Sequence, residues 1–155
     1  MPKTLKLLFV LADGGRARFV MRSGAGDYAV VKALDGTPAL TAARAASRGA
    51  TPGVVFESAT AAPHGLRPKG VVQQAKAVFA AEVAGAAERE ARRQGAAGLV
   101  LVAPARTLSL LRTHLGAASP VLASLAKDLG KTPAHELGRW LNSLELSAQA
   151  IARAA

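Results

Sequence analysis

The sequence of 155 residues contains no cysteine. A disulfide framework, a thiolate zinc site and a cysteine nucleophile are therefore excluded. Aromatic residues make up only 4%, so the core has to be built mainly from alanine, valine and leucine. Acidic residues are also few, because 10 Asp and Glu stand against 20 Lys and Arg, for a formal charge of +10. This balance favours an anionic partner such as nucleic acid, the ribosome or an acidic membrane.

Long hydrophobic runs are missing as well. The apolar run near the N-terminus stops at Asp13, which makes it too short for a transmembrane helix. Arg16 and Arg18 follow at once, so a signal-peptide cleavage site is not apparent. We therefore expect a cytoplasmic protein without an integral membrane segment. Hydrophobic residues make up 50% and charged residues 19%, and the length fits one globular domain.

The first third of the chain predicts three strands. Residues 5–12 (LKLLFVLA) are apolar and end at the turn signal Asp13-Gly14-Gly15. Residues 16–21 alternate charged with apolar side chains, and residues 28–34 form a third apolar segment after a glycine-rich turn. Because connections this short join antiparallel neighbours, we expect a three-stranded meander.

Residues 35–70 differ in composition from the rest of the chain. They are rich in Ala, Gly, Pro, Ser and Thr, and we expect a long basic loop or insertion here. Within it, residues 39–47 predict a short helical turn and residues 54–56 a short strand. Two interpretations stay open, a solvated insertion and a basic binding loop. The charged residues are Arg44, Arg48, Arg67 and Lys69 against Glu57.

The second half predicts alternating helices and strands. A helix is expected over 71–94, a buried strand over 99–103, a helix over 107–115 and a strand over 121–125. A last helix should begin with Thr132 as N-cap and Pro133 as its first residue, and residues 146–155 should fray or continue it. The order β-β-β-α-β-α-β-α predicts a single α/β domain with a mixed sheet of the ribonuclease-H-like type.

Acidic residues suggest one catalytic hypothesis. Asp13 ends the first strand, where ribonuclease-H-like nucleases carry a metal-binding carboxylate, and Glu82 and Asp128 are the other candidate acids. Two-metal catalysis needs several clustered carboxylates, but the fourth strand ends in Val102-Ala103-Pro104. We therefore expect no metal site and no metal-dependent nuclease activity. The alternative role for Asp13 is turn formation with the two glycines that follow it.

Other catalytic patterns are absent from the sequence. His64, His114 and His135 lack metal-ligand spacing, and there is no GxSxG motif, P-loop or Gly-Gly-Gln tripeptide. We therefore expect a noncatalytic protein that needs no cofactor.

The basic residues suggest a binding surface instead. Arg16 and Arg18 share one face of their strand because side chains alternate along a strand. We expect both to be exposed and to form a phosphate-binding surface that ignores base sequence. The other basic residues expected there are Arg22, Arg67, Lys69 and Lys76. The alternative is an ordinary solvated edge strand whose charge prevents aggregation.

Three segments together resemble a known family. Residues 11–19 (LADGGRARF), 99–108 (LVLVAPARTL) and 127–137 (KDLGKTPAHEL) resemble, in the same order, motifs of bacterial proteins required for attachment to host cells. The motif positions include Asp13, Gly14, Arg16, Pro104, Lys127 and Asp128. The acidic, histidine-rich stretch usual before the long helix is missing, and residues 67–73 (RPKGVVQ) stand there.

That family is similar to bacterial relatives of the archaeo-eukaryotic release factors. The resemblance implies a ribonuclease-H-like domain and ribosome association. We therefore expect a noncatalytic, release-factor-like module that binds RNA or the ribosome. The alternative is an attachment protein that binds another protein or an anionic surface polymer. The sequence leaves the oligomeric state open.

Overall fold

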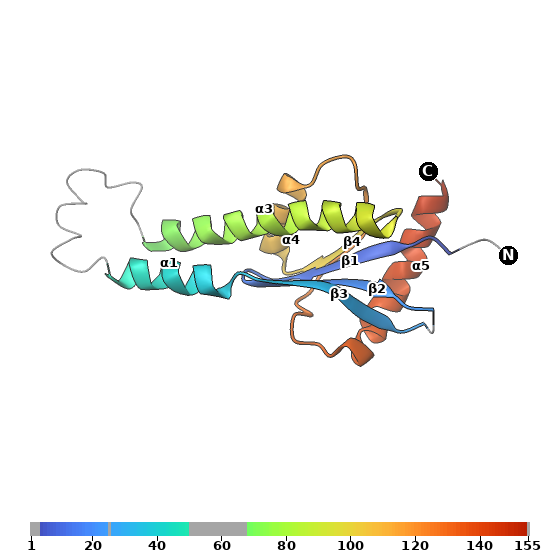
Figure 1. Cartoon of the computed structure of the whole chain (residues 1–155), viewed down its shortest axis with the longest axis horizontal. Coiled ribbons are helices and arrows are strands. Elements are labelled where there is room, and N and C mark those ends of the chain that lie inside the picture. Colours follow the sequence, from blue (N-terminus) through green and yellow to red (C-terminus); the bar gives the residue numbers. More distant parts are fainter. Residues whose placement is uncertain (1–3, 25, 50–67, 155) are drawn as a thin grey trace.

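The computed structural model describes residues 4–24, 26–49 and 68–154, which form one α/β domain around a five-stranded sheet (Figure 1). The strand order is β3-β2-β1-β4-β5. The strands are β1 (Leu7–Ala12), β2 (Arg16–Arg22), β3 (Tyr28–Asp35), β4 (Gly98–Ala103) and β5 (Val121–Ala126).

The sheet is mixed, as the sequence predicts. β1, β2 and β3 pair antiparallel, which confirms the meander. β4 lies parallel to β1 on its other side, and β5 lies parallel to β4. The carboxyl ends of β1, β4 and β5 therefore meet at one edge of the sheet, which we call the carboxyl edge. The amino end of β2 and the carboxyl end of β3 lie there too, because Arg16 pairs with Asp35.

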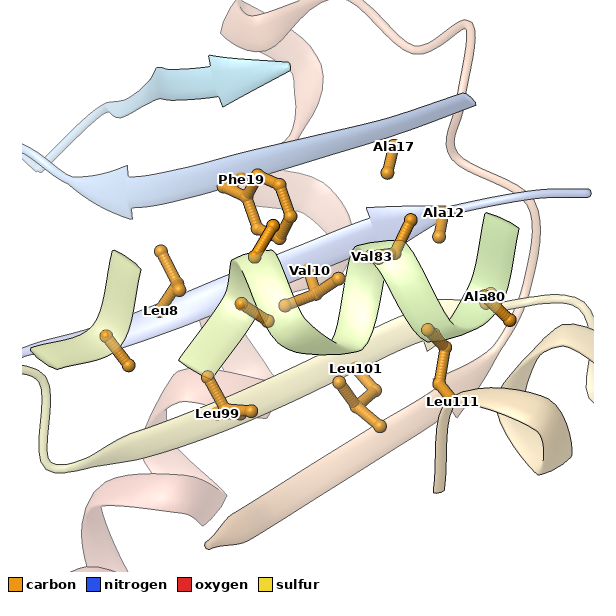
Figure 2. Close-up of a cluster of buried hydrophobic side chains, with 14 of the residues drawn as sticks. Leu8, Val10, Ala12, Ala17, Phe19, Ala80, Val83, Leu99, Leu101 and Leu111 are labelled. Atoms are coloured by element: carbon orange, nitrogen blue, oxygen red, sulfur yellow. The ribbon is translucent and has the colours of Figure 1, made fainter. Parts of the chain in front are cut away.

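Helices cover both faces of the sheet (Figure 1). They are α1 (Thr37–Gly49), α3 (Pro68–Gln94), α4 (Ala105–His114) and α5 (Gly138–Ala154), with a 3-10 turn, η1 (Ala134–Glu136). α3 and α4 pack on one face, where Val83 and Leu111 contact the sheet (Figure 2). η1 and α5 cover the other face through Leu137 and Leu141.

The central strands are apolar because both of their faces are buried. All six residues of β1 and all six of β4 are buried. Val10 and Leu101 point toward α3, whereas Phe9 and Val102 point toward α5. Burial on both sides explains why these strands read as continuous hydrophobic runs. The prediction of a central buried strand over 99–103 is confirmed.

The short helical turn predicted over 39–47 lies inside a longer helix, the 13-residue α1, which replaces the first third of the loop expected over 35–70. Asp35 begins α1 by accepting a hydrogen bond from the Thr37 backbone at 2.9 Å. Leu40 and Ala43 then bury one side of the helix. The sequence predicts only a short helical turn here, because Leu40 and Ala43 do not make a long hydrophobic stripe. The strand expected over 54–56 lies outside the described residues.

The expected start of the last helix is also wrong. Pro133 precedes the 3-10 turn η1, and α5 begins at Gly138. The buried Leu137 lies between the two and anchors them against the sheet. α5 continues to Ala154, so residues 146–154 extend the helix. The observed order of elements therefore differs from the predicted one by two additions, α1 after β3 and η1 before α5.

α1 and the first part of α3 lie side by side and extend beyond the carboxyl edge of the sheet (Figure 1). We call α1 together with residues 68–76 of α3 the helical arm. In the described ranges, no helix has both the length and the apolar character needed to cross a membrane.

Candidate functional site

The family-motif residues, although scattered in the sequence, gather at the carboxyl edge. Asp13 and Gly14 follow β1, Arg16 begins β2, and Pro104 follows β4. Lys127 and Asp128 follow β5. The parallel pairing of β1, β4 and β5 brings these positions together. The edge is therefore the first place to look for function.

Asp13 shapes the turn between β1 and β2. Its Oδ1 accepts hydrogen bonds from the backbone N–H groups of Gly15 and Arg16, both at 2.7 Å. Its own N–H donates to the Arg16 carbonyl at 2.9 Å. Such side-chain-to-backbone bonds are typical of Asp in tight turns. Oδ1 of Asp13 thus stabilises the turn, which is the alternative role considered for this residue.

The second oxygen of Asp13 faces the segment that follows β5. A Cβ added to Gly130 would lie 3.1 Å from Oδ2 of Asp13 and 3.1 Å from Oδ1 of Asp128. The sheet therefore brings together two of the three candidate acids. The third candidate acid, Glu82, is exposed on α3. Within the described ranges, no three His, Asp or Glu side chains are grouped so that they could hold a metal ion.

The two strand arginines behave differently from each other. Arg16 is exposed, and its Nε lies 3.8 Å from Oδ1 of Asp35. Arg18 is half-buried, and its Nη2 donates to the Leu129 carbonyl at 2.6 Å. Burial lowers the pKa of Arg18 from its ordinary value. The expectation that both are freely exposed is therefore wrong for Arg18, because the segment after β5 packs over it.

The remaining predicted binding residues lie near the arm. Lys69 is in the first turn of α3, and its side chain is outside the described residues. Arg67 lies outside them altogether. Whether they join Arg16 therefore stays a prediction.

Lys127 has a packing role. Its Nζ lies 3.9 Å from the centroid of the Trp140 ring, which is a cation–π contact. This contact ties the end of β5 to α5.

A cavity of about 340 Å³ opens at the carboxyl edge, at the base of the helical arm. It lies between the β1–β2 turn, α3 and the start of α4. Its walls combine a cation from α3 with the amino end of α4. The lining residues are Asp13, Gly14, Gln73, Lys76, Ala80, Pro104, Ala105, Arg106, Thr107 and Leu110. The sequence indicates Lys76 as a possible phosphate contact, but it does not predict the cavity, because Thr107 is far from Lys76 in the chain and belongs to no recognisable motif.

The helical arm carries basic side chains without acidic ones. Arg44 and Arg48 are exposed on α1. The sequence contains no Asp or Glu in residues 37–49 or 68–81. The excess of basic charge in these two segments was visible in the sequence. The sequence predicted only a short helical turn over 39–47 and not the full length of α1, which displays this charge on a helical surface.

A comparison with protein families gives one result. The model of the family described as "protein required for attachment to host cells" matches residues 8–141. The match covers the sheet, apart from the first residue of β1, and the start of α5. No curated protein is similar enough to this sequence to count as a match.

Proposed function

Because the chain belongs to the family of proteins required for attachment to host cells, we propose a function for it that its structure supports. The proposal is that the protein is a noncatalytic, cytoplasmic module that binds RNA, with the ribosome as the natural source of that RNA. The helical arm is the contact surface.

The observation that carries this proposal is the charge of the arm. Arg44 and Arg48 project into solvent from α1, and in the part of the chain that the structure describes neither has an ion-pair partner. Segments 37–49 and 68–81 hold no acidic residue that could repel phosphate. An arm that extends beyond the sheet can reach into a groove of a folded RNA, where phosphate density is high.

The fold supports the release-factor-like part of the proposal. The order β3-β2-β1-β4-β5, with an antiparallel first half and a parallel second half, is the arrangement expected of a ribonuclease-H-like domain. We therefore assign the domain to that fold type by analogy. Fold alone does not imply an activity, so RNA binding depends on the arm and not on the topology.

The other predicted contacts extend the same surface. Arg16 lies at the carboxyl edge, from which the arm projects, and Lys69 lies in the first turn of α3 with Arg67 before it in sequence. We include these three among the proposed phosphate contacts. Arg18 contributes charge only, because its guanidinium already binds the Leu129 carbonyl.

A salt titration of RNA binding tests the proposal. The test variant combines Arg44→Ala with Arg48→Ala, which preserves the helix because alanine is the strongest helix former. The control combines Arg139→Ala with Arg153→Ala, which removes the same charge from exposed positions of α5. Log affinity should fall linearly with log salt, by about 0.7–0.9 per phosphate contact, and the test variant should flatten that slope. The control should keep it.

Two results would count against RNA binding by the arm. One is equal slopes for the test variant and the control. The other is tight binding to a sulfated polysaccharide, or to one protein from an envelope fraction, with no binding to ribosomal RNA at low salt. The second result would favour the attachment function that the family description states.

A further inference from the structure

The cavity at the base of the arm has features that the proposed RNA binding does not need. We propose that it is a phosphate-binding site, which accepts the free anion or the terminal phosphate of an ester. The cavity is built by the β1–β2 turn, α3 and the start of α4. It shares Lys76 with the arm, but it does not depend on Arg44 and Arg48, the two arginines of α1 that the RNA-binding proposal rests on.

The amino end of α4 supplies the first element of this site. α4 has ten residues and begins after Pro104, with no side-chain hydrogen bond capping it and no acid in its first turn. The first backbone hydrogen bond of the helix is donated by the N–H of Leu108 to the Pro104 carbonyl, at 2.9 Å. The earlier N–H groups are therefore left for a ligand, and the helix dipole makes this end attractive to anions.

Thr107 supplies a second, independent element. It lines the cavity and is only 9% exposed, yet among the described residues its hydroxyl has no hydrogen-bond partner. The residue as a whole is buried, and polar groups of buried residues normally have a partner in the folded protein. The Thr107 hydroxyl is not among the described unpartnered polar atoms that are sealed from solvent, so a ligand can reach it. A ligand in the cavity is the partner that this geometry provides for.

Lys76 and Arg106 supply the charge. A Cβ built on Gly14 would lie 3.3 Å from Cε of Lys76, so the lysine side chain lies against the β1–β2 turn at the cavity wall. Arg106 lines the cavity from the first turn of α4. Neither has an ion pair in the described ranges 4–24, 26–49 and 68–154. Together they offer two cations to a group that carries one to two negative charges.

Asp13 also lines the cavity, but its carboxylate is engaged elsewhere. Its Oδ1 already accepts two backbone hydrogen bonds within the turn. Its Oδ2 lies 3.1 Å from the position of a Cβ on Gly130, which is not part of the cavity lining. Asp13 thus shapes the turn next to the site, and its single negative charge is outnumbered there by the two cations of Lys76 and Arg106.

The position of the cavity relative to the sheet agrees with a phosphate-binding site. The cavity lies beyond the carboxyl ends of β1 and β4, which are neighbours. The chain leaves β1 toward β2 on one side and leaves β4 toward β5 on the other. In open α/β sheets, ligands bind in the crevice at such a switch point.

Backbone amide NMR with inorganic phosphate tests the site. Phosphate is added at constant ionic strength, with chloride replaced in proportion. The amide resonances of Ala105, Arg106 and Thr107 should move and saturate. Lys76→Ala and Thr107→Val should each weaken binding about tenfold or more, whereas Thr107→Ser, which keeps the hydroxyl, should bind like the parent. The amide spectrum of each variant also reports whether it is folded.

A matched control and a second ligand complete the test. Arg153→Ala removes an exposed cation from the far end of α5 and should leave phosphate binding unchanged. A nucleoside monophosphate should shift the same three amides if the site takes esters, and inorganic phosphate alone should do so if it takes only the free anion. Phosphate binding that persists in the Arg44/Arg48 double variant separates this site from the arm. Unmoved α4 amides, or Lys76→Ala and Thr107→Val binding as the parent does, would overturn the proposal.

Discussion

Tyr28, on the edge strand β3, donates a hydrogen bond of 2.9 Å from its phenolic hydroxyl to the buried carboxylate of Glu145 on α5. Nη1 of Arg22 lies 3.3 Å from the same carboxylate oxygen. The Tyr28 ring also packs edge-on against Phe9, with 5.3 Å between the ring centroids. These contacts join the outer part of the sheet to α5, so this buried carboxylate is satisfied by a hydroxyl and a cation.

Tyr28 should titrate far above an ordinary tyrosine. Burial raises its pKa first, and the hydrogen bond to Glu145 and the negative charge of Glu145 raise it further. Because the raised pKa favours the neutral form in the folded state, its contribution to stability is complete below the ordinary value of 10.0 and is lost as pH rises above it. Tyr28 is the only tyrosine, so phenolate absorbance reports on it alone.

The measurement compares this absorbance in the native protein with that in denaturant. We expect phenolate to form near the ordinary pKa only in the unfolded chain. Tyr28→Phe should unfold at lower denaturant concentration at neutral pH and should lose part of the stability change at alkaline pH. A native titration that coincides with the unfolded one would contradict the buried contact.

A charge in the central strand should unfold the domain. Val102 is 0% exposed, between β1 and β5, on the face covered by α5. Val102→Asp would bury a carboxylate without a partner and should cost several kcal/mol, about 3 or more. Leu146→Asp is the matched control, since Leu146 is 72% exposed. Denaturant unfolding should show a large loss for the first variant and little change for the second.

The sequence predicts the sheet well because the sheet obeys local rules. Short turns require antiparallel neighbours, and an apolar run such as that of β4 requires cover on both faces. For α1 the sequence predicts only a short helical turn over 39–47, because the full helix depends on contacts of Leu40 with distant parts of the chain. Leu40, for example, packs against Gly15, where a Cβ would lie 2.9 Å from Cδ1 of the leucine.

The site is less predictable than the fold. The family motifs indicate which residues meet at the carboxyl edge, but not what each one touches. Asp13 and Asp128 converge on Gly130 only because β1 and β5 run in the same direction. The cavity needs Lys76 and Thr107 to approach from two helices, and neither spacing nor composition reports that.

Acid should weaken the domain through Glu90. This residue is 4% exposed on α3, and its Oε1 lies 2.7 Å from Nη2 of Arg93. The hydrogen bond from Arg93, followed by that from Gln94, lowers the pKa of Glu90 below its ordinary value of 4.5. The stability it contributes is therefore present above pH 4.5 and lost as pH falls through the lowered pKa.

Replacing Glu90 with Gln should remove this acid-dependent part. Urea unfolding from neutral pH to pH 3 should show a smaller loss of stability in Glu90→Gln than in the parent. Glu82→Gln, at an exposed position of the same helix, is the control and should follow the parent. Identical acid profiles for Glu90→Gln and the parent would refute the role of this carboxylate.

Arg18 and Arg16 should differ in their effect on stability, although they share a strand face. Arg18 Nη2 donates at 2.6 Å to the carbonyl of Leu129, a residue that is itself buried in the core. Arg18→Ala leaves that carbonyl without its charged donor, which should cost about 1–3 kcal/mol. Part of this loss is offset, because the buried Nε of Arg18 lacks a partner within the described part of the chain. Arg16→Ala should leave the free energy of unfolding nearly unchanged, since Arg16 is exposed and 3.8 Å from Asp35.

Denaturant unfolding of the two single variants measures this difference directly. Hydrogen exchange adds a local test: the amides of residues 127–132 should exchange faster in Arg18→Ala, because the segment after β5 loses its link to β2. Arg16→Ala should leave their exchange unaltered. If both variants lose the same stability, or if exchange in this segment stays at the parent rate in Arg18→Ala, then Arg18 is a surface cation. In that case it would belong with Arg16 among the proposed phosphate contacts.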